Sequence, residues 1–201
     1  MKVLGLDTTG PHCSVALVDT AKVLAHKSEN IGRGHAERLA PMVQEVLAEA
    51  GLKAKDVDKL AVCTGPGSFT GLRVALAFAK GFALPRKLLV VGLPSLAIWA
   101  AQADPEAQKN LVSIADVRRN ELCWNAVFKG ALIQEPITQK REEAHRSIKK
   151  LSPDIILEDE ITDARTLAWL GAELSPKDYP AAPLYSRGPD AKLPGGIEPP
   201  K

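Results

Sequence analysis

A chain of 201 residues with 45% hydrophobic and 25% charged residues and a formal net charge of +2 has the balance of an ordinary globular protein. It is long enough for one large domain or two small ones, and its composition excludes bulk disorder. The small net charge permits contact with nucleic acid without indicating it. Cys13, Cys63 and Cys123 are far apart and form no CxxC pair, so they indicate reduced thiols and not a disulfide framework or a zinc site.

Two further features predict a cytoplasmic protein with no membrane partner. Residues 1–7 reach an acidic side chain, Asp7, too early for a secretory signal. The longest apolar run is interrupted by Lys80 and Pro85, and it is too short to span a membrane.

The first part of the chain predicts three short strands followed by a helix. Residues 3–7, 14–19 and 23–27 are strand candidates joined by turn sequences, which predicts an antiparallel meander. From about residue 36 to residue 51 the apolar period becomes helical. Its apolar stripe consists of Leu39, Met42, Val43, Val46, Leu47 and Ala50. Gly51 suits the C-terminal cap, and Pro41 either starts the main helix or kinks it.

A strand at residues 60–63, an apolar helix at 69–84, a strand at 88–91 and a helix at 94–103 follow. This order predicts a mixed sheet, in which an antiparallel hairpin lies beside parallel strands. The composition turns polar around residue 104. We therefore expect a first domain over residues 1–104, a smaller one over 105–188 and a loosely ordered tail over 189–201. The second domain should contain strands at 111–115, 122–128 and 154–157 and a helix at 164–170.

The helix at 69–84 is apolar on most sides, because only Thr70, Arg73 and Lys80 are polar. A helix that lies on a sheet needs one apolar stripe, and a helix that is apolar nearly all round must be covered twice. This pattern predicts a partner surface on this helix.

Two turns could hold a phosphate. In the first, Asp7, Thr8 and Thr9 connect two strands, and they either bind an anion and its metal or form an ordinary turn. In the second, Gly65, Gly67 and Ser68 precede a helix. Their amides suit an anion, but their spacing matches neither the dinucleotide fingerprint nor a P-loop. The alternative is that Ser68 caps the helix while the glycines allow a tight turn.

No pattern indicates a self-sufficient active site. The four histidines include no pair one helical turn apart, which predicts no metal site. The charged cluster around Asp116 and Arg118 either holds a ligand or forms exposed ion pairs. The basic run over residues 140–150 either touches RNA phosphates or forms a solvated helix face; two glutamates interrupt it and no aromatic residue lies within it.

Several motifs in the same order resemble those of the TsaB (YeaZ) family over nearly the whole chain. They are residues 7–10 (DTTG), 35–42 (HAERLAPM), 64–73 (TGPGSFTGLR), 94–96 (PSL), 116–121 (DxRxxE) and 183–187 (PLYxR). The resemblance implies an actin-like (ASKHA, ribonuclease H-like) α/β fold with two tandem subdomains, the second reduced.

The resemblance also implies a role without a reaction of its own. TsaB-like proteins are non-catalytic subunits of the machinery that makes threonylcarbamoyladenosine in tRNA. They pair with the catalytic paralogue TsaD and act with the ATPase TsaE, so tRNA would be an indirect partner. In TsaD a His-x-x-x-His pair binds the metal, whereas here His35 is followed by Leu39. No cofactor is expected for the lone subunit, although ATP or ADP could lie at the interface of the complex.

In the family, the first two helices pack against the same helices of the partner. The residues expected at this interface are Leu39, Met42, Val43, Val46, Leu72, Leu76, Phe78 and Ala79. The same surface could form a homodimer when the chain is alone. The alternatives are a stand-alone ATP-dependent phosphotransferase of the same superfamily and an M22-type metallopeptidase.

Overall fold

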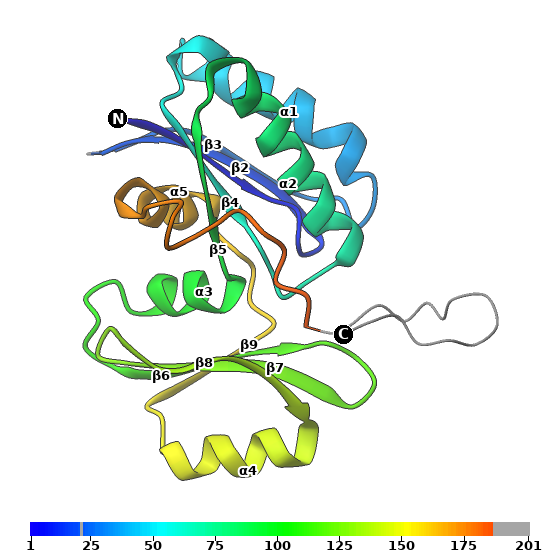
Figure 1. Ribbon diagram of the computed structural model, residues 1–201, viewed down its shortest axis with the longest axis vertical. Helices are drawn as coiled ribbons and strands as arrows, with labels where there is room; N and C mark the ends of the chain where they lie inside the picture. Colours follow the sequence, from blue (N-terminus) through cyan, green and yellow to red (C-terminus); the bar gives the residue numbers. More distant parts are fainter. Residues whose placement is uncertain (21, 187–201) are drawn as a thin grey trace, which may run out of the picture.

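The computed structural model describes residues 1–20 and 22–186, and it contains two sheets with helices on both faces of each (Figure 1). The predicted tail over residues 189–201 lies outside this described part. Among the described residues, no helix is both long enough and apolar enough to cross a membrane.

The first sheet has the strand order β3-β2-β1-β4-β5. Its antiparallel part is formed by β1 (Lys2–Asp7), β2 (His12–Asp19) and β3 (Lys22–Asn30). The strands β4 (Lys59–Cys63) and β5 (Leu89–Leu93) add to β1 in parallel. The mixed sheet predicted from the order of the elements is confirmed.

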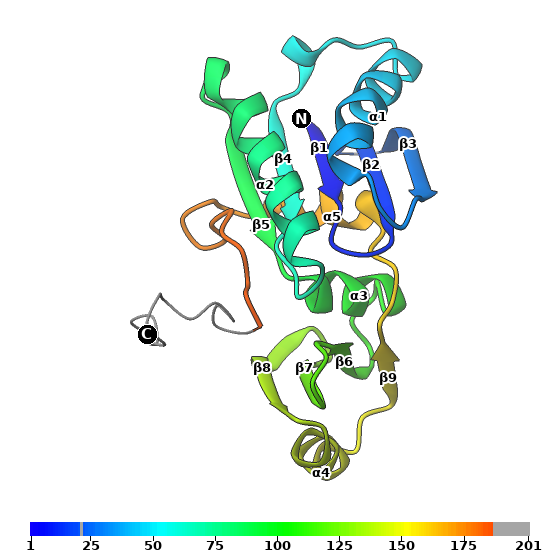
Figure 2. The same ribbon diagram turned by 90° about the vertical axis from the view of Figure 1, so that its right-hand side faces the viewer.

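Both faces of this sheet are covered. On one face lie α1 (His35–Glu49) and α2 (Phe69–Ala83), and on the other lies α5 (Ala164–Glu173), as Figures 1 and 2 show. Short 3-10 turns, η1 (Ala54–Asp56) and η2 (Leu84–Arg86), follow α1 and α2. Because strands covered on two faces bury both rows of side chains, β1, β2 and β4 are almost continuously apolar.

The second sheet has the order β8-β7-β6-β9. Its strands are β6 (Asn110–Asp116), β7 (Glu121–Phe128), β8 (Ala131–Lys140) and β9 (Ile155–Glu158). Against its two faces pack α3 (Ser95–Ala103) and α4 (Arg141–Leu151). The sequence prediction omits β8, since Gln134, Glu135 and Pro136 interrupt its apolar pattern.

The predicted division into domains 1–104 and 105–188 is wrong, because the last described helix packs on the first sheet. The helix α5 returns to the first sheet, where it packs against β1, β2 and β4. The ammonium group of Lys59 on β4 donates to the carbonyls of Ala172 (3.0 Å) and Leu174 (2.5 Å), at the C-terminal end of α5. A cation placed there also complements the helix dipole. The second unit, which includes α3, is therefore an insertion between β5 and α5, and residues 105–188 are not one domain.

Pro41 lies inside α1, which begins at His35, so it does not start the helix. The helix is fastened to β3 by an ion-pair network. The Arg38 guanidinium donates to the carboxylates of Glu29 (2.6 and 2.7 Å) and Glu45 (2.7 and 2.9 Å), and Lys27 also donates to Glu45 (2.7 Å). Bidentate arginine–carboxylate pairs of this kind are the strongest of the charged hydrogen bonds.

This network predicts how stability depends on acid. Hydrogen bonds from Arg38 and Lys27 lower the pKa of Glu45 from its ordinary 4.5 to about 2, and Arg38 also lowers the pKa of Glu29. Because these pKa values are depressed in the folded state, the unfolded chain takes up protons first as the pH falls. The stabilisation is therefore complete above about pH 4.5 and is lost as the pH falls toward 2.

We expect Arg38→Met to lower the free energy of unfolding most at neutral pH and progressively less below pH 4.5. Urea unfolding between pH 7 and pH 2 measures this difference. Arg146→Met, which changes an exposed arginine of α4, is the control. A loss in Arg38→Met that stays constant across the acid range would contradict the assignment.

Candidate functional site

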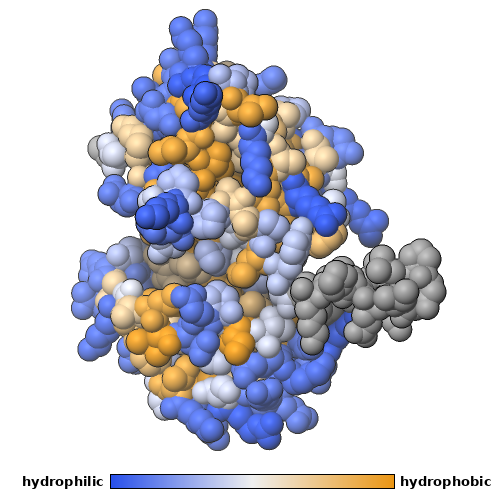
Figure 3. All heavy atoms as spheres, in the orientation of Figure 1, coloured by the Kyte–Doolittle hydropathy of each residue, from blue (hydrophilic) through white to orange (hydrophobic). Residues whose placement is uncertain are grey.

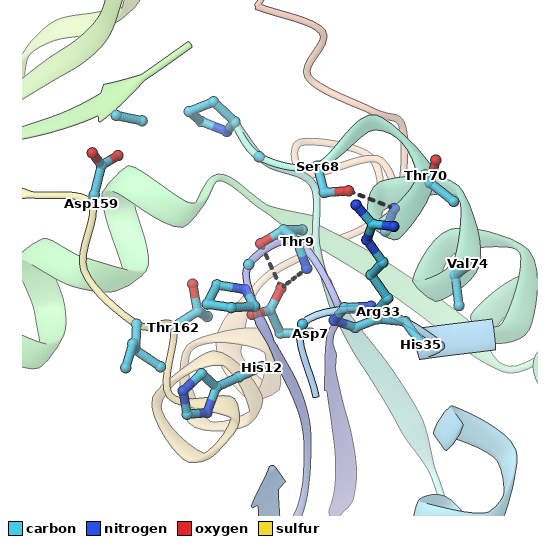
Figure 4. A pocket seen from close by; sticks show the side chains of 18 of the residues that line it. Asp7, Thr9, His12, Arg33, His35, Ser68, Thr70, Val74, Asp159 and Thr162 are labelled. Carbon is cyan, nitrogen blue, oxygen red and sulfur yellow. Dashed lines mark hydrogen bonds between the residues drawn. The ribbon is translucent and has the colours of Figure 1, made fainter. Parts of the chain in front are cut away.

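A cleft of about 1140 Å³ lies between the two sheets. Its walls come from the β1–β2 turn, the loop before α1, the first turn of α2, the end of β6 and residues 159–162. Figure 4 shows Asp7, Thr9, His35, Ser68 and Thr162 around it. The cleft therefore contains several of the side chains that the sequence singled out.

Asp7 ends β1 at the floor of the cleft, where its side chain is almost completely buried. Its Oδ1 accepts hydrogen bonds from the Thr9 amide (2.9 Å) and the Thr9 hydroxyl (2.7 Å), which Figure 4 marks. Desolvation raises the pKa of Asp7, while these two hydrogen bonds lower it less strongly. Because the Thr9 amide already donates to the Asp7 carboxylate, the turn agrees with the interpretation as an ordinary turn.

The glycine-rich turn packs directly on this β1–β2 turn. The Ser68 amide donates to the Thr9 carbonyl (2.7 Å), and the Ser68 hydroxyl accepts from the Gly71 amide (3.2 Å) as the N-terminal cap of α2. The Thr8 hydroxyl donates to the Gly71 carbonyl (2.6 Å). The capping interpretation of Ser68 is confirmed.

The close approach of these two turns explains two of the glycines. A Cβ atom on Gly71 would lie 1.8 Å from the Thr8 carbonyl oxygen, and one on Gly67 would lie 2.5 Å from that of Thr9. Only glycine allows contacts this short. Gly65 has a φ of +91°, which also favours glycine.

His35 begins α1 at the rim of the cleft, and its Nε2 is buried without a hydrogen-bond partner among the described residues. One helical turn later Leu39 is buried in the hydrophobic core, so it cannot supply a second polar ligand. The described residues contain no group of three His, Cys, Asp or Glu side chains that could hold a metal ion.

The charged cluster at the end of β6 consists of ion pairs within the chain. The Asp116 carboxylate accepts from the Arg118 amide (2.7 Å) and from the Arg141 guanidinium (2.9 Å). Lys140 pairs with Glu121 at 2.9 Å. Hydrogen bonds from Arg118 and Arg141 lower the pKa of Asp116. The ion-pair interpretation therefore accounts for these residues, while Arg146, Lys149 and Lys150 are exposed on α4.

The residues predicted at the partner interface require a correction. Seven of the eight are buried in the core between the first sheet and the helix pair, namely Leu39, Met42, Val43, Val46, Leu72, Leu76 and Ala79. Phe78 is half-buried and packs against the same core. The sequence predicted an apolar stripe on the first helix and a second helix that is apolar on most sides, but the family resemblance assigned these buried residues to the wrong neighbour. They face the chain's own sheet.

The outward side of the helix pair shares only Leu39 and Phe78 with the predicted set. A shallow groove of about 460 Å³ lies between α1 and α2. The groove is lined by Ala36, Leu39, Phe69, Thr70, Arg73, Val74, Ala77 and Phe78. Over the half of the molecule that contains the first sheet, apolar side chains are exposed between charged ones (Figure 3).

Sequence reasoning missed one cluster at the end of this groove. Phe69 is 53% exposed, and its ring lies 5.3 Å from that of Tyr185, between centroids. The Arg73 guanidinium lies over the Phe69 ring at 3.8 Å, and its Nε donates to the Tyr185 hydroxyl at 3.3 Å. No local pattern predicts a contact between residues 112 positions apart.

The strand order 3-2-1-4-5, a smaller second sheet and a cleft between them define a protein of the actin-like (ASKHA) class. Residues 22–166 match the model of the family described as TsaD, tRNA N6-adenosine threonylcarbamoyltransferase. The tRNA threonylcarbamoyladenosine biosynthesis protein TsaB of Escherichia coli (strain K12) is 33% identical over 160 residues, which cover 76% of this chain and 68% of that protein.

The protein of the same name from Haemophilus influenzae is 38% identical over 130 residues, which cover 64% of this chain and 55% of that protein. Among solved structures, YeaZ from Pseudomonas aeruginosa matches with a TM-score of 0.76 and 27% identity over 92% of this chain and 99% of that one. The chain belongs to the TsaB (YeaZ) family.

The contact between the two turns predicts the effect of Gly71→Ala. The added methyl group would overlap the Thr8 carbonyl, so either α2 or the β1–β2 turn must move. We expect a loss of unfolding free energy on the order of 3 kcal/mol, at the upper end for overpacking.

The matched control is Gly81→Ala on the exposed side of the same helix, where an added Cβ meets no atom within 4 Å. This change should raise stability by roughly 0.5–1 kcal/mol through helix propensity. Urea denaturation of both variants tests the prediction, and equal stabilities would show that the turns do not constrain α2.

Proposed function

We propose that the chain is a non-catalytic subunit of the machinery that makes threonylcarbamoyladenosine in tRNA, and that it acts by pairing with a TsaD-like catalytic paralogue. The observation that carries this proposal is family membership combined with the exposed groove between α1 and α2. The proposal also includes a TsaE-like ATPase as a further partner, indirect contact with tRNA, a cytoplasmic location and a homodimer when the chain is alone.

The outward side of the helix pair suits close packing against other helices. Ala36 and Ala40 on α1, and Ala77 and Gly81 on α2, are exposed and have short or no side chains. Small residues allow helices to approach closely, and the half-buried Phe78 beside them adds apolar area. This surface replaces the buried residues that sequence reasoning placed at the interface.

The kind of partner follows from the relationship to TsaD. The matched residues 22–166 include both α1 and α2, so a TsaD-like protein carries an equivalent helix pair. Two related chains can pack the same surfaces about an approximate two-fold axis, as subunits of a symmetric dimer do. The catalytic role then falls to the paralogue, since this chain has Leu39 one turn after His35 instead of a second metal-binding histidine.

A substitution on the outward side tests the interface. We expect Ala77→Arg to leave the fold intact, because Ala77 is exposed, and to abolish co-elution with a TsaD-like partner on size-exclusion chromatography. A long charged side chain would hold the helices apart and bury an unpaired charge. A change at Leu76 would not be informative, because that side chain is only 5% exposed and belongs to the core.

The control is Ala131→Arg, at an exposed alanine in β8 of the second sheet, which should co-elute as the unchanged protein does. Persistent co-elution of folded Ala77→Arg would refute this placement of the interface.

We further propose that the lone subunit needs no cofactor and that any ATP or ADP lies at the interface of the complex. Support comes from the turns, where the amides of Thr9 and Ser68 already donate to Asp7 and to Thr9. Calorimetric titration of the lone chain with magnesium-ATP should therefore give no binding heat. Tight binding with turnover would instead favour the phosphotransferase alternative.

A further inference from the structure

The segment that follows α5 is fastened along the first sheet before it reaches α2. The Gly92 amide donates to the Tyr179 carbonyl (3.0 Å), and Val91 forms a bridge with Pro180. The Leu184 amide then donates to the carbonyl of Thr64 (2.8 Å), directly before the glycine-rich turn. Figure 2 shows this segment, in orange, passing beside β5. These bonds place Tyr185 at the N-terminal end of α2.

At that position Tyr185 completes a three-residue cluster with Phe69 and Arg73. The two rings stack at a tilt of 36°, and Arg73 contacts both partners, as a cation over the Phe69 ring and as a donor to the Tyr185 hydroxyl. Such contacts restrict the rotamers of the long arginine side chain. Phe69 and Tyr185 are nonetheless 53% and 43% exposed, so the cluster is a fixed structure on the surface.

The composition and charge of the cluster suit a docking anchor. Tyrosine and arginine are enriched at the residues that contribute most to binding. Among the described residues no carboxylate forms an ion pair with Arg73, so within that part of the chain its guanidinium retains donors for a further acceptor. Phe69 and Arg73 also line the groove between α1 and α2, so the cluster is continuous with the proposed interface.

We propose that Tyr185 is a positioning residue for the partner surface, which it serves by holding Arg73 and Phe69 in the geometry that the partner binds. The occupant is the catalytic paralogue, which would present a carboxylate or main-chain carbonyl to Arg73 beside an apolar side chain on Phe69. This inference rests on the proposed function. It assigns to the C-terminal segment a part in docking in addition to the two helices.

The test measures the dissociation constant for the TsaD-like partner by biolayer interferometry at low and high salt, with the full chain. Tyr185→Ala should weaken binding about tenfold, as an interface anchor does. Tyr185→Phe keeps the ring stack with Phe69 but removes the hydroxyl that accepts from Arg73, so it should recover only part of the affinity. The melting temperature should change little in either variant, because Tyr185 lies at the surface and is 43% exposed. Tyr179→Ala, at a second exposed tyrosine of the same segment, is the control and should bind normally.

A double-mutant cycle separates positioning from an independent contact. If Tyr185 acts through Arg73, then the double variant Tyr185→Ala with Arg73→Met should bind no more weakly than Arg73→Met alone. Arg73→Met should also make the dissociation constant less dependent on salt. Additive losses, or unchanged binding of Tyr185→Ala, would overturn the inference. If Ala77→Arg abolishes binding while Tyr185→Ala does not affect it, this inference alone fails. If Ala77→Arg also binds normally, the placement of the interface on the helix pair fails, and if the unchanged chain does not bind the TsaD-like partner, the proposed function fails.

Discussion

The arrangement of the first sheet and its helices depends on the direct contact between the β1–β2 turn and the first turn of α2. The Thr8 hydroxyl donates to the Gly71 carbonyl, and the Ser68 amide donates to the Thr9 carbonyl. Neither bond could form with a larger side chain at position 71, where an added Cβ would overlap the Thr8 carbonyl. This contact holds the first turn of α2 directly against the β1–β2 turn.

The same contact joins two surfaces with different roles. On its inner side lies the cleft, with Asp7 buried at the floor. On its outer side begins the groove of α1 and α2, with Phe69 and Arg73 at its end. Polar groups that could bind a phosphate instead bind each other, which accords with a subunit that acts through its outer surface. The C-terminal segment reaches this outer surface by pairing with β5 and with Thr64.

Two segments of the chain connect the first sheet to the second, one before α3 and one before α5. Because α3 packs on β6 and β7 while α5 packs on β1, β2 and β4, the chain crosses twice between the units on either side of the cleft. Lys59 on β4 secures the return by donating to carbonyls at the end of α5, which lie more than 110 positions further along the chain. The polar stretch around residue 104 follows α3, which already packs on the second sheet, so it lies after the first crossing, and nothing local marked the second.

The sequence by itself determined the types and order of most elements, the mixed sheet and the family, because these follow from periodicity, turn residues and local motifs. It also identified the apolar stripe of the first helix and the apolar character of the second, and it offered the cap at Ser68 as one of two alternatives, which the structure decided. Only the tertiary structure decided that Leu39 and Leu76 face the chain's own sheet, that α5 returns to the first unit and that Tyr185 meets Arg73. The physical reason is that periodicity states which side of a helix avoids water, whereas the neighbour that covers that side depends on contacts between distant parts of the chain.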